Sequence, residues 1–160
     1  MTDHASRSPA AHASTARTGV PAGERVLALI TAALLGVDGF VHLRYAANYD
    51  GFKSSVMSEG TLFRIQAVVA IVVAVILLIW PRVLTWLLSL LVAGSAAIAV
   101  TLYTYVNVGQ LGPLPNLYEN TWHEPGKVFS AGAETVAALL SIVGLLLAVR
   151  ARRARRHESY

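Results

Sequence analysis

The sequence predicts an all-α protein, a bundle of four transmembrane helices, and three observations support this prediction. Of the 160 residues, 55% are hydrophobic and 14% are charged, whereas about 25% of residues are charged in soluble domains. The hydrophobic residues gather in four long runs, each about the 20 residues that span a bilayer core as a helix. Basic residues flank these runs. An ordinary soluble enzyme is therefore excluded.

The first two hydrophobic runs differ in their polar content. The first contains both an acid and a histidine, Asp38 and His42. The second is uncharged after Arg64, which lies near its start. Each run is long enough to cross a bilayer once as a helix with some tilt. The first two helices are therefore predicted at residues 25–47 and 61–80.

The third and fourth runs complete the predicted bundle. Pro81 and Arg82 leave room for only a very short turn before the third run, which is uncharged throughout. The fourth run carries one acid, Glu134, within its first two turns. These helices are predicted at residues 83–106 and 128–149, so that the transmembrane domain covers residues 25–150.

Polar tails flank the predicted transmembrane domain. Residues 1–24 are rich in Ala, Ser, Thr, Gly and Pro without an apolar stretch, which is typical of a disordered tail. The first hydrophobic run starts too far along the chain to be a cleaved signal peptide, so we expect it to anchor the protein. Residues 151–160 form a basic tail.

The basic residues predict the orientation in the membrane. Four crossings place both termini on one side, where nine of the thirteen basic residues lie. These nine are Arg7, Arg17, Arg25, Arg82, Arg150, Arg152, Arg153, Arg155 and Arg156. Because basic residues concentrate in cytoplasmic segments, both termini are predicted to be cytoplasmic. The arginines lie in tails rather than on a folded basic surface, so nucleic-acid binding is not expected.

The composition also bears on the source and on thiol chemistry. Arginine is far more frequent than lysine, and alanine and valine are abundant, which is typical of a GC-rich bacterial genome. We therefore expect a multi-pass protein of the bacterial inner membrane. The chain has no cysteine, so disulfides, thiolate metal ligands and cysteine nucleophiles are excluded.

The longest connection, residues 107–127, is predicted to fold back as a cap over the extracytoplasmic end of the bundle. It is too rich in proline to be helical throughout, and too rich in large apolar and aromatic residues to be merely solvated. Its candidate functional residues are Glu119, Trp122, His123 and Glu124.

Four polar residues of the helices fall at a similar depth, in the outer half of the predicted bundle. Asp38 and His42 lie on one face of the first helix, since positions i and i+4 stack. Arg64 lies near the outer start of the second helix, and Glu134 near that of the fourth. Charges in hydrocarbon are costly and usually pair, so Arg64 is predicted to pair with Asp38, Glu134 or both. On this hypothesis the cluster is a structural network that fixes how the helices pack.

The same residues also fit functional hypotheses. Carboxylates and histidines beneath a cap are suited to bind a metal ion, to relay protons, or to hold the polar head of a quinone or lipid. The candidate metal ligands are His42, His123, Glu134 and Asp38. Their spacing matches no established metal motif, and no phosphate loop, nucleophile elbow or dinucleotide fingerprint occurs. The sequence motifs therefore identify no particular cofactor and no catalytic residue.

Two stretches resemble small four-helix membrane proteins of actinobacteria. The first stretch is GVDGFVHLRYAANYDGF, followed after a short gap by GTLFRIQAVVAIVVAVILL. The second is the loop LGPLPNLYENTWHEPGK. In size and helix count the chain is similar to the DoxX-like group, over roughly residues 26–150. This resemblance implies a four-helix fold and a link to redox and quinone functions of membranes, but it assigns no catalytic residues.

The leading functional hypothesis is a non-enzymatic membrane component whose polar cluster organises the bundle and binds a quinone-like or lipid headgroup. One alternative is a metal- or proton-handling redox accessory or small transporter. Another is a structural subunit of a larger membrane complex, because small bundles often depend on partners or on a second copy of themselves. The lipid bilayer is the partner common to all three hypotheses.

The orientation is directly testable. A reporter fused after Tyr160 is expected to be cytoplasmic, because the basic residues lie on that side. Activity of the fusion on each side of the membrane measures this. A reporter that proves extracytoplasmic contradicts both the topology and the depth assigned to the polar residues.

Overall fold

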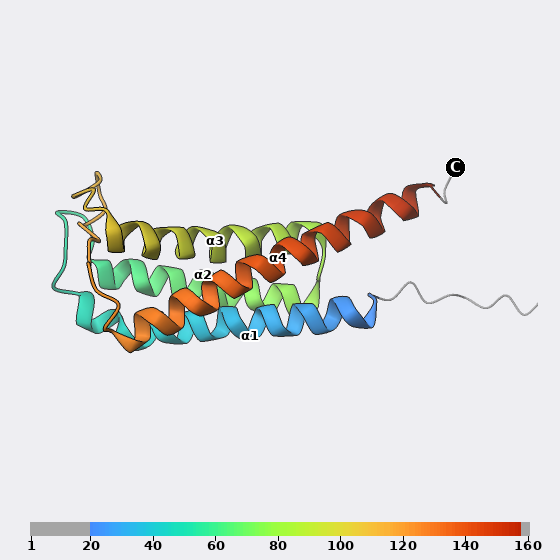
Figure 1. Cartoon of the computed structure of the whole chain (residues 1–160), viewed down its shortest axis with the longest axis horizontal. Coiled ribbons are helices and arrows are strands. Elements are labelled where there is room, and N and C mark those ends of the chain that lie inside the picture. The colour runs from blue at the N-terminus through green and yellow to red at the C-terminus, as the bar shows by residue number, and fades with distance from the viewer. Residues whose placement is uncertain (1–19, 158–160) are drawn as a thin grey trace, which may run out of the picture.

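The computed structural model describes residues 20–157 and consists of four long helices packed side by side (Figure 1). They are α1 (Ala22–Tyr45), α2 (Glu59–Ile79), α3 (Val83–Tyr105) and α4 (Pro125–His157). A short 3₁₀ helix, η1 (Ala46–Tyr49), follows α1 directly. The described residues contain no β-strand beyond two isolated bridges. This confirms the predicted all-α fold with four helices.

The two ends of the bundle differ in how the helices are connected (Figure 1). At one end, here called the loop end, lie η1 with residues 50–58 and the long loop 106–124. At the other, the turn end, α2 and α3 are joined by a tight turn, α1 begins and α4 projects beyond its neighbours. The loop end is the one on which the predicted cap lies.

The helix boundaries differ from the predicted ones mainly in α1 and α4. Residues 22–24 belong to α1 and not to a disordered tail, and the predicted tail over residues 1–19 lies outside the described residues. The fourth helix begins at Pro125, because proline is tolerated in a first helical turn. It continues through the arginines to His157, since Arg and Ala are strong helix formers. The predicted basic tail is thus helical as far as residue 157.

Local sequence explains where α2 begins and ends. The Ser58 side chain accepts a hydrogen bond from the backbone N–H of Thr61 at 3.0 Å and so caps the first turn. At the other end, Pro81 cannot continue the helix, because it lacks an N–H and restricts the residue before it. The Arg82 backbone N–H then donates to Thr85 Oγ1 at 2.8 Å, which starts α3.

The outer surface of the helices is apolar. All four helices are long and apolar enough to cross a bilayer. Large side chains such as Phe40, Ile98 and Phe129 are each about two-thirds exposed, at 67%, 69% and 69%. Soluble proteins rarely expose contiguous apolar surface on this scale, whereas lipid is a favourable environment for it. The chain is therefore a multi-pass membrane protein.

The interior between the helices is built mainly from small residues. Its largest buried cluster contains Ala32, Leu35, Ala70, Val73, Ala74, Ala93 and Ala137. Small side chains let helix backbones approach closely, and dispersion contacts then hold the helices together in lipid. A buried hydrogen bond between Ser89 and Ser141, with 2.7 Å between the two hydroxyl oxygens, adds a polar link between α3 and α4.

Trp86 packs against a glycine of α4 near the turn end. Its ring is fully buried, and its Nε1 lies 3.4 Å from Glu24 Oε1 on α1. A methyl group on Gly144 would run into this ring. The glycine is therefore needed for the close approach of α3 and α4 at this level.

We predict that Gly144→Ala destabilises the bundle by about 1–3 kcal/mol, because the added methyl group overpacks a site closed by a buried ring. Thermal or chemical unfolding in detergent measures this. The matched control is Gly132→Ala on the same helix, where the added methyl group meets nothing within 4 Å. Equal effects of the two substitutions would contradict the close α3–α4 contact.

Candidate functional site

Side chains from three helices meet in a polar cluster inside the loop-end half of the bundle. Asp38 and His42 come from α1, Gln66 from α2, and Ser130 and Glu134 from α4. The α-helical repeat stacks each pair that is four residues apart, so Asp38 lies beside His42 and Ser130 beside Glu134. Asp38 and Glu134 are almost fully buried, at 0% and 2% exposed.

The approach of α2 to this cluster depends on Gly39. A side chain at this position would press on Ile71 of α2 and on the Ala67 carbonyl oxygen. Because Gly39 has no side chain, the two helices come close enough for Gln66 Nε2 to donate to Asp38 Oδ2 at 3.1 Å.

Asp38 is the centre of the hydrogen-bond network. His42 Nδ1 lies 2.8 Å from Asp38 Oδ1 and 3.0 Å from the backbone oxygen of the same residue. The Ser130 hydroxyl lies 3.0 Å from Asp38 Oδ1 and 2.6 Å from Glu134 Oε1. The two buried carboxylates thus share one serine, which links α1 to α4.

The cluster has fewer hydrogen-bond donors than its carboxylate oxygens require. Ser130 has a single hydroxyl hydrogen, which it donates to only one of the two carboxylates at a time. Glu134 Oε2 is buried and has no hydrogen-bond partner among the described residues. Buried polar groups in proteins are nearly always paired, and an unpaired buried acceptor costs about 1–3 kcal/mol. This oxygen is therefore the feature of the site that a ligand would satisfy.

The geometry also brings three candidate metal ligands together. One ligand atom each from Asp38, His42 and Glu134 lies within 4.8 Å of the other two. Among the described residues, no Lys or Arg side chain forms a salt bridge with either acid, and His42 is the only basic partner. Three of the four predicted metal candidates thus lie together in the fold.

Arg64 does not belong to this cluster, and the prediction that it pairs with Asp38 or Glu134 is wrong. Its guanidinium instead binds both oxygens of Asp50, at 2.7 and 2.8 Å. Arg64 is 45% exposed, because its side chain turns towards the connection after η1. This charged hydrogen bond holds the pKa of the Asp50 carboxyl below its usual range.

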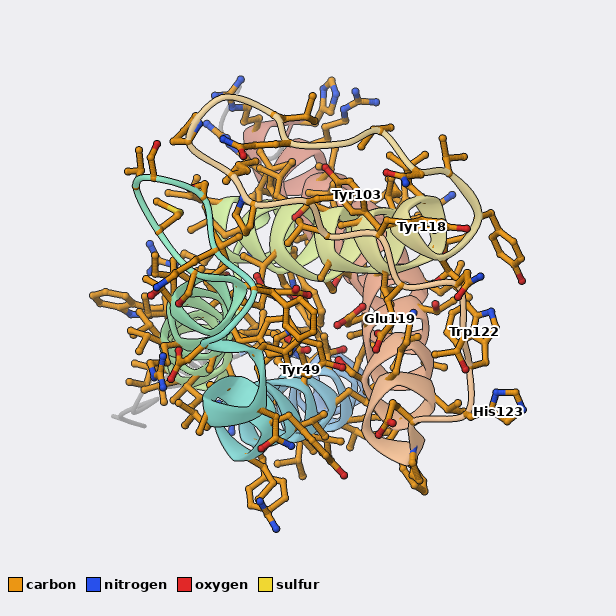
Figure 2. All side chains as sticks on the ribbon, turned by 90° about the vertical axis from the view of Figure 1, so that its left-hand side faces the viewer. Tyr49, Tyr103, Tyr118, Glu119, Trp122 and His123 are labelled. Atoms are coloured by element: carbon orange, nitrogen blue, oxygen red, sulfur yellow. The ribbon has the colours of Figure 1, made fainter. Side chains whose placement is uncertain are left out.

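His123 is also not placed with the other candidate ligands. It is exposed, and its Nδ1 lies 2.7 Å from the hydroxyl of Thr121 in the same loop. In the view onto the loop end, His123 lies at the outer edge of the bundle (Figure 2). The loop therefore supplies no histidine to the buried cluster.

The other predicted cap residues have separate places in the loop. Glu119 accepts a hydrogen bond from the Tyr49 hydroxyl at 3.1 Å and forms a salt bridge with Lys127 at 3.2 Å. In Figure 2, Tyr49 and Glu119 lie near the middle of the loop end. Trp122 donates instead to the Tyr105 hydroxyl at 3.2 Å, at the side of the bundle. Glu119 thus ties the long loop to both η1 and α4.

A cavity of about 330 Å³ lies between the loop and the buried cluster. Its polar wall includes His42, Gln66, Ser130 and Glu134 at depth, and Glu59, Glu119, Glu124 and Lys127 nearer the loop. Its apolar wall comes largely from α2 and α3, with Leu62, Phe63, Ile65, Ala96, Ala99 and Val100. The loop covers the cavity with Leu117, Glu119 and Glu124. Two of the four predicted cluster residues, His42 and Glu134, therefore line a cavity of small-molecule size, and a third, Asp38, contacts His42.

Several site residues had not been singled out from the sequence. Gln66 and Ser130 are uncharged, and so their place in the network depends on how α2 and α4 are rotated. Ser130 lies four residues before Glu134, which is the one sequence feature that would have placed both on the same helix face. Tyr49 and Lys127 lie in predicted connections, where no sequence pattern marks them, and they meet Glu119 only in the folded structure.

Comparison with family models, curated proteins and solved structures finds no match to this chain. The similarity to DoxX-like proteins therefore stays a prediction from the quoted residues. What the chain does has to be inferred from its own fold and site.

Proposed function

We propose that this membrane protein binds the polar head of a quinone-like amphipathic molecule in the loop-end cavity. The observation that supports this proposal is the cavity's composition, with an apolar wall from α2 and α3 opposite the polar groups of α1 and α4. Its volume of about 330 Å³ is at the lower end of the range of about 300–1,000 Å³ for small-molecule sites. A headgroup fits this volume, while an attached tail extends among apolar surfaces.

The charges around the cavity favour a neutral headgroup. Four glutamates line it, Glu59, Glu119, Glu124 and Glu134, against one lysine. That lysine, Lys127, is already bound to Glu119. An anionic phosphate would meet more negative than positive groups here, and like charges at close range are unfavourable. Carbonyl and hydroxyl groups, as in a quinone and its reduced form, avoid this repulsion and still form hydrogen bonds.

The polar groups at the base of the cavity match that chemistry. The Gln66 amide has a second N–H besides the one that it donates to Asp38, and Glu134 Oε2 is an acceptor without a partner. A hydroxyl of a reduced quinone would donate to this oxygen, while a carbonyl would accept from a nitrogen. With the termini in the cytoplasm of a bacterial cell, the cavity lies in the extracytoplasmic half of the membrane.

The proposal is tested by mass analysis of lipids that copurify with the protein and by binding of decylubiquinone to the delipidated protein. We expect a quinone to copurify and decylubiquinone to bind. Ala96→Phe is expected to weaken this binding at least about tenfold, a loss of about 1.4 kcal/mol, because the ring fills the cavity from α3.

The control is Ile98→Phe on the same helix, at a position that is 69% exposed and outside the cavity. It adds the same ring to the lipid-facing surface and is expected to leave binding unchanged. Copurification of anionic phospholipid alone, or equal binding by both variants, would count against a quinone-like headgroup in this cavity.

A further inference from the structure

We infer that Asp38, His42 and Glu134 form a binding site for one divalent transition-metal ion at the base of the cavity. The inference goes beyond the proposed headgroup binding, because it concerns an inorganic ion held by side chains of α1 and α4. Three features of the cluster support it: its geometry, its shortage of donors and the charge of its ligands.

The geometry suits a single ion. Ligand atoms of the three side chains all lie within 4.8 Å of one another. Ligands at about 2.0–2.2 Å from a tetrahedral ion are separated by about 3.4 Å, so the two most distant ligand atoms need to close up by at most about 1.4 Å. All three residues lie on helices, and two of them are four residues apart on α1. Rigid elements therefore hold the ligands near the required spacing.

The unpaired oxygen of Glu134 is the second feature. Glu134 is 2% exposed, lines the cavity, and its Oε2 has no hydrogen-bond partner among the described residues. Its other oxygen already has Ser130 beside it at 2.6 Å. A metal ion beside Oε2 supplies the positive charge that the protein's own donors do not provide there. The hydrogen bonds from Ser130 and Gln66 would then orient the Asp38 carboxylate towards the ion, as hydrogen-bond partners of metal ligands usually do.

The charge of the cluster is the third feature. Metal binding requires a deprotonated His42 and two carboxylates, and this ligand set carries a formal charge of −2 in a buried place between apolar helices. The salt bridges of Arg64 and Lys127 are with Asp50 and Glu119 instead, so neither cation pairs with the cluster. A divalent cation neutralises two carboxylates completely, which removes most of the cost of burying unpaired charge.

The donor set selects the class of ion. One imidazole and two carboxylates suit Zn²⁺, Mn²⁺ or Fe²⁺, whereas Ca²⁺ and Mg²⁺ prefer oxygen ligands alone. Three protein ligands leave at least one coordination position free. Because His42 and Glu134 line the cavity, that free position is on the cavity side.

The site is tested with purified full-length protein in detergent, freed of metal by a chelator and then titrated with Zn²⁺ and with Co²⁺ as an optical probe. We expect one ion per chain and a Co²⁺ absorption spectrum characteristic of nitrogen and oxygen ligands. Glu134→Gln and His42→Gln, which preserve side-chain size and hydrogen bonding in part, are expected to weaken Zn²⁺ binding at least about tenfold.

His123→Gln is the matched control, because it removes an exposed histidine that lies outside the cluster. It is expected to leave the stoichiometry and affinity unchanged, and thermal unfolding of each variant shows that its fold is retained. Failure of the folded wild-type protein to bind either ion, or an equal loss in His123→Gln, overturns the inference. Neither result affects decylubiquinone binding by the metal-free protein, so the two proposals fail separately.

Discussion

Two buried carboxylates constrain the loop-end half of this bundle. Asp38 and Glu134 lie between helices whose outer surfaces are apolar, and the donors around them do not reach all of their oxygens. The bonds that do form come from His42 on α1, Gln66 on α2 and Ser130 on α4. The carboxylates therefore hold three helices in one arrangement, and the unpaired Glu134 oxygen makes the same place suitable for a ligand.

The rest of the fold supports this arrangement from the two ends. Towards the turn end, small residues, the Trp86–Gly144 contact and the buried Ser89–Ser141 hydrogen bond bring the helices together. At the loop end, Glu119 binds Tyr49 and Lys127, so the long loop covers the cavity above the carboxylates. The bundle thus combines an alanine-rich core, which allows close helix packing in lipid, with a partly polar cavity at the loop end. The proposed headgroup and metal sites adjoin each other in that cavity.

Hydropathy alone was sufficient to predict the four helices, because a bilayer requires long apolar runs. Helical spacing and depth were sufficient to place Asp38, His42 and Glu134 at one level. Depth does not determine which way a side chain points, and for this reason the predicted partner of Arg64 was wrong. Arg64 lies near the start of α2, next to the connection that contains Asp50, and this nearer carboxylate binds it. Gln66 and Ser130 were missed because uncharged polar residues do not stand out in an apolar run. His123 was predicted as a ligand but lies outside the cluster, because a loop has no periodicity from which the position of a side chain can be inferred.

Both proposed sites depend on Asp38 and Glu134 lying in one cluster, linked through Ser130. A double-mutant cycle of unfolding free energies with Asp38→Asn and Glu134→Gln, in metal-free protein, measures this most directly. We predict a coupling energy of about 0.5–3 kcal/mol for this pair, because the two carboxylates share Ser130. A cycle that combines Glu134→Gln with Asp50→Asn should be additive within about 0.3–0.5 kcal/mol, since Asp50 lies with Arg64 outside the cluster. Additivity of Asp38→Asn with Glu134→Gln would contradict the shared cluster on which both proposals rest.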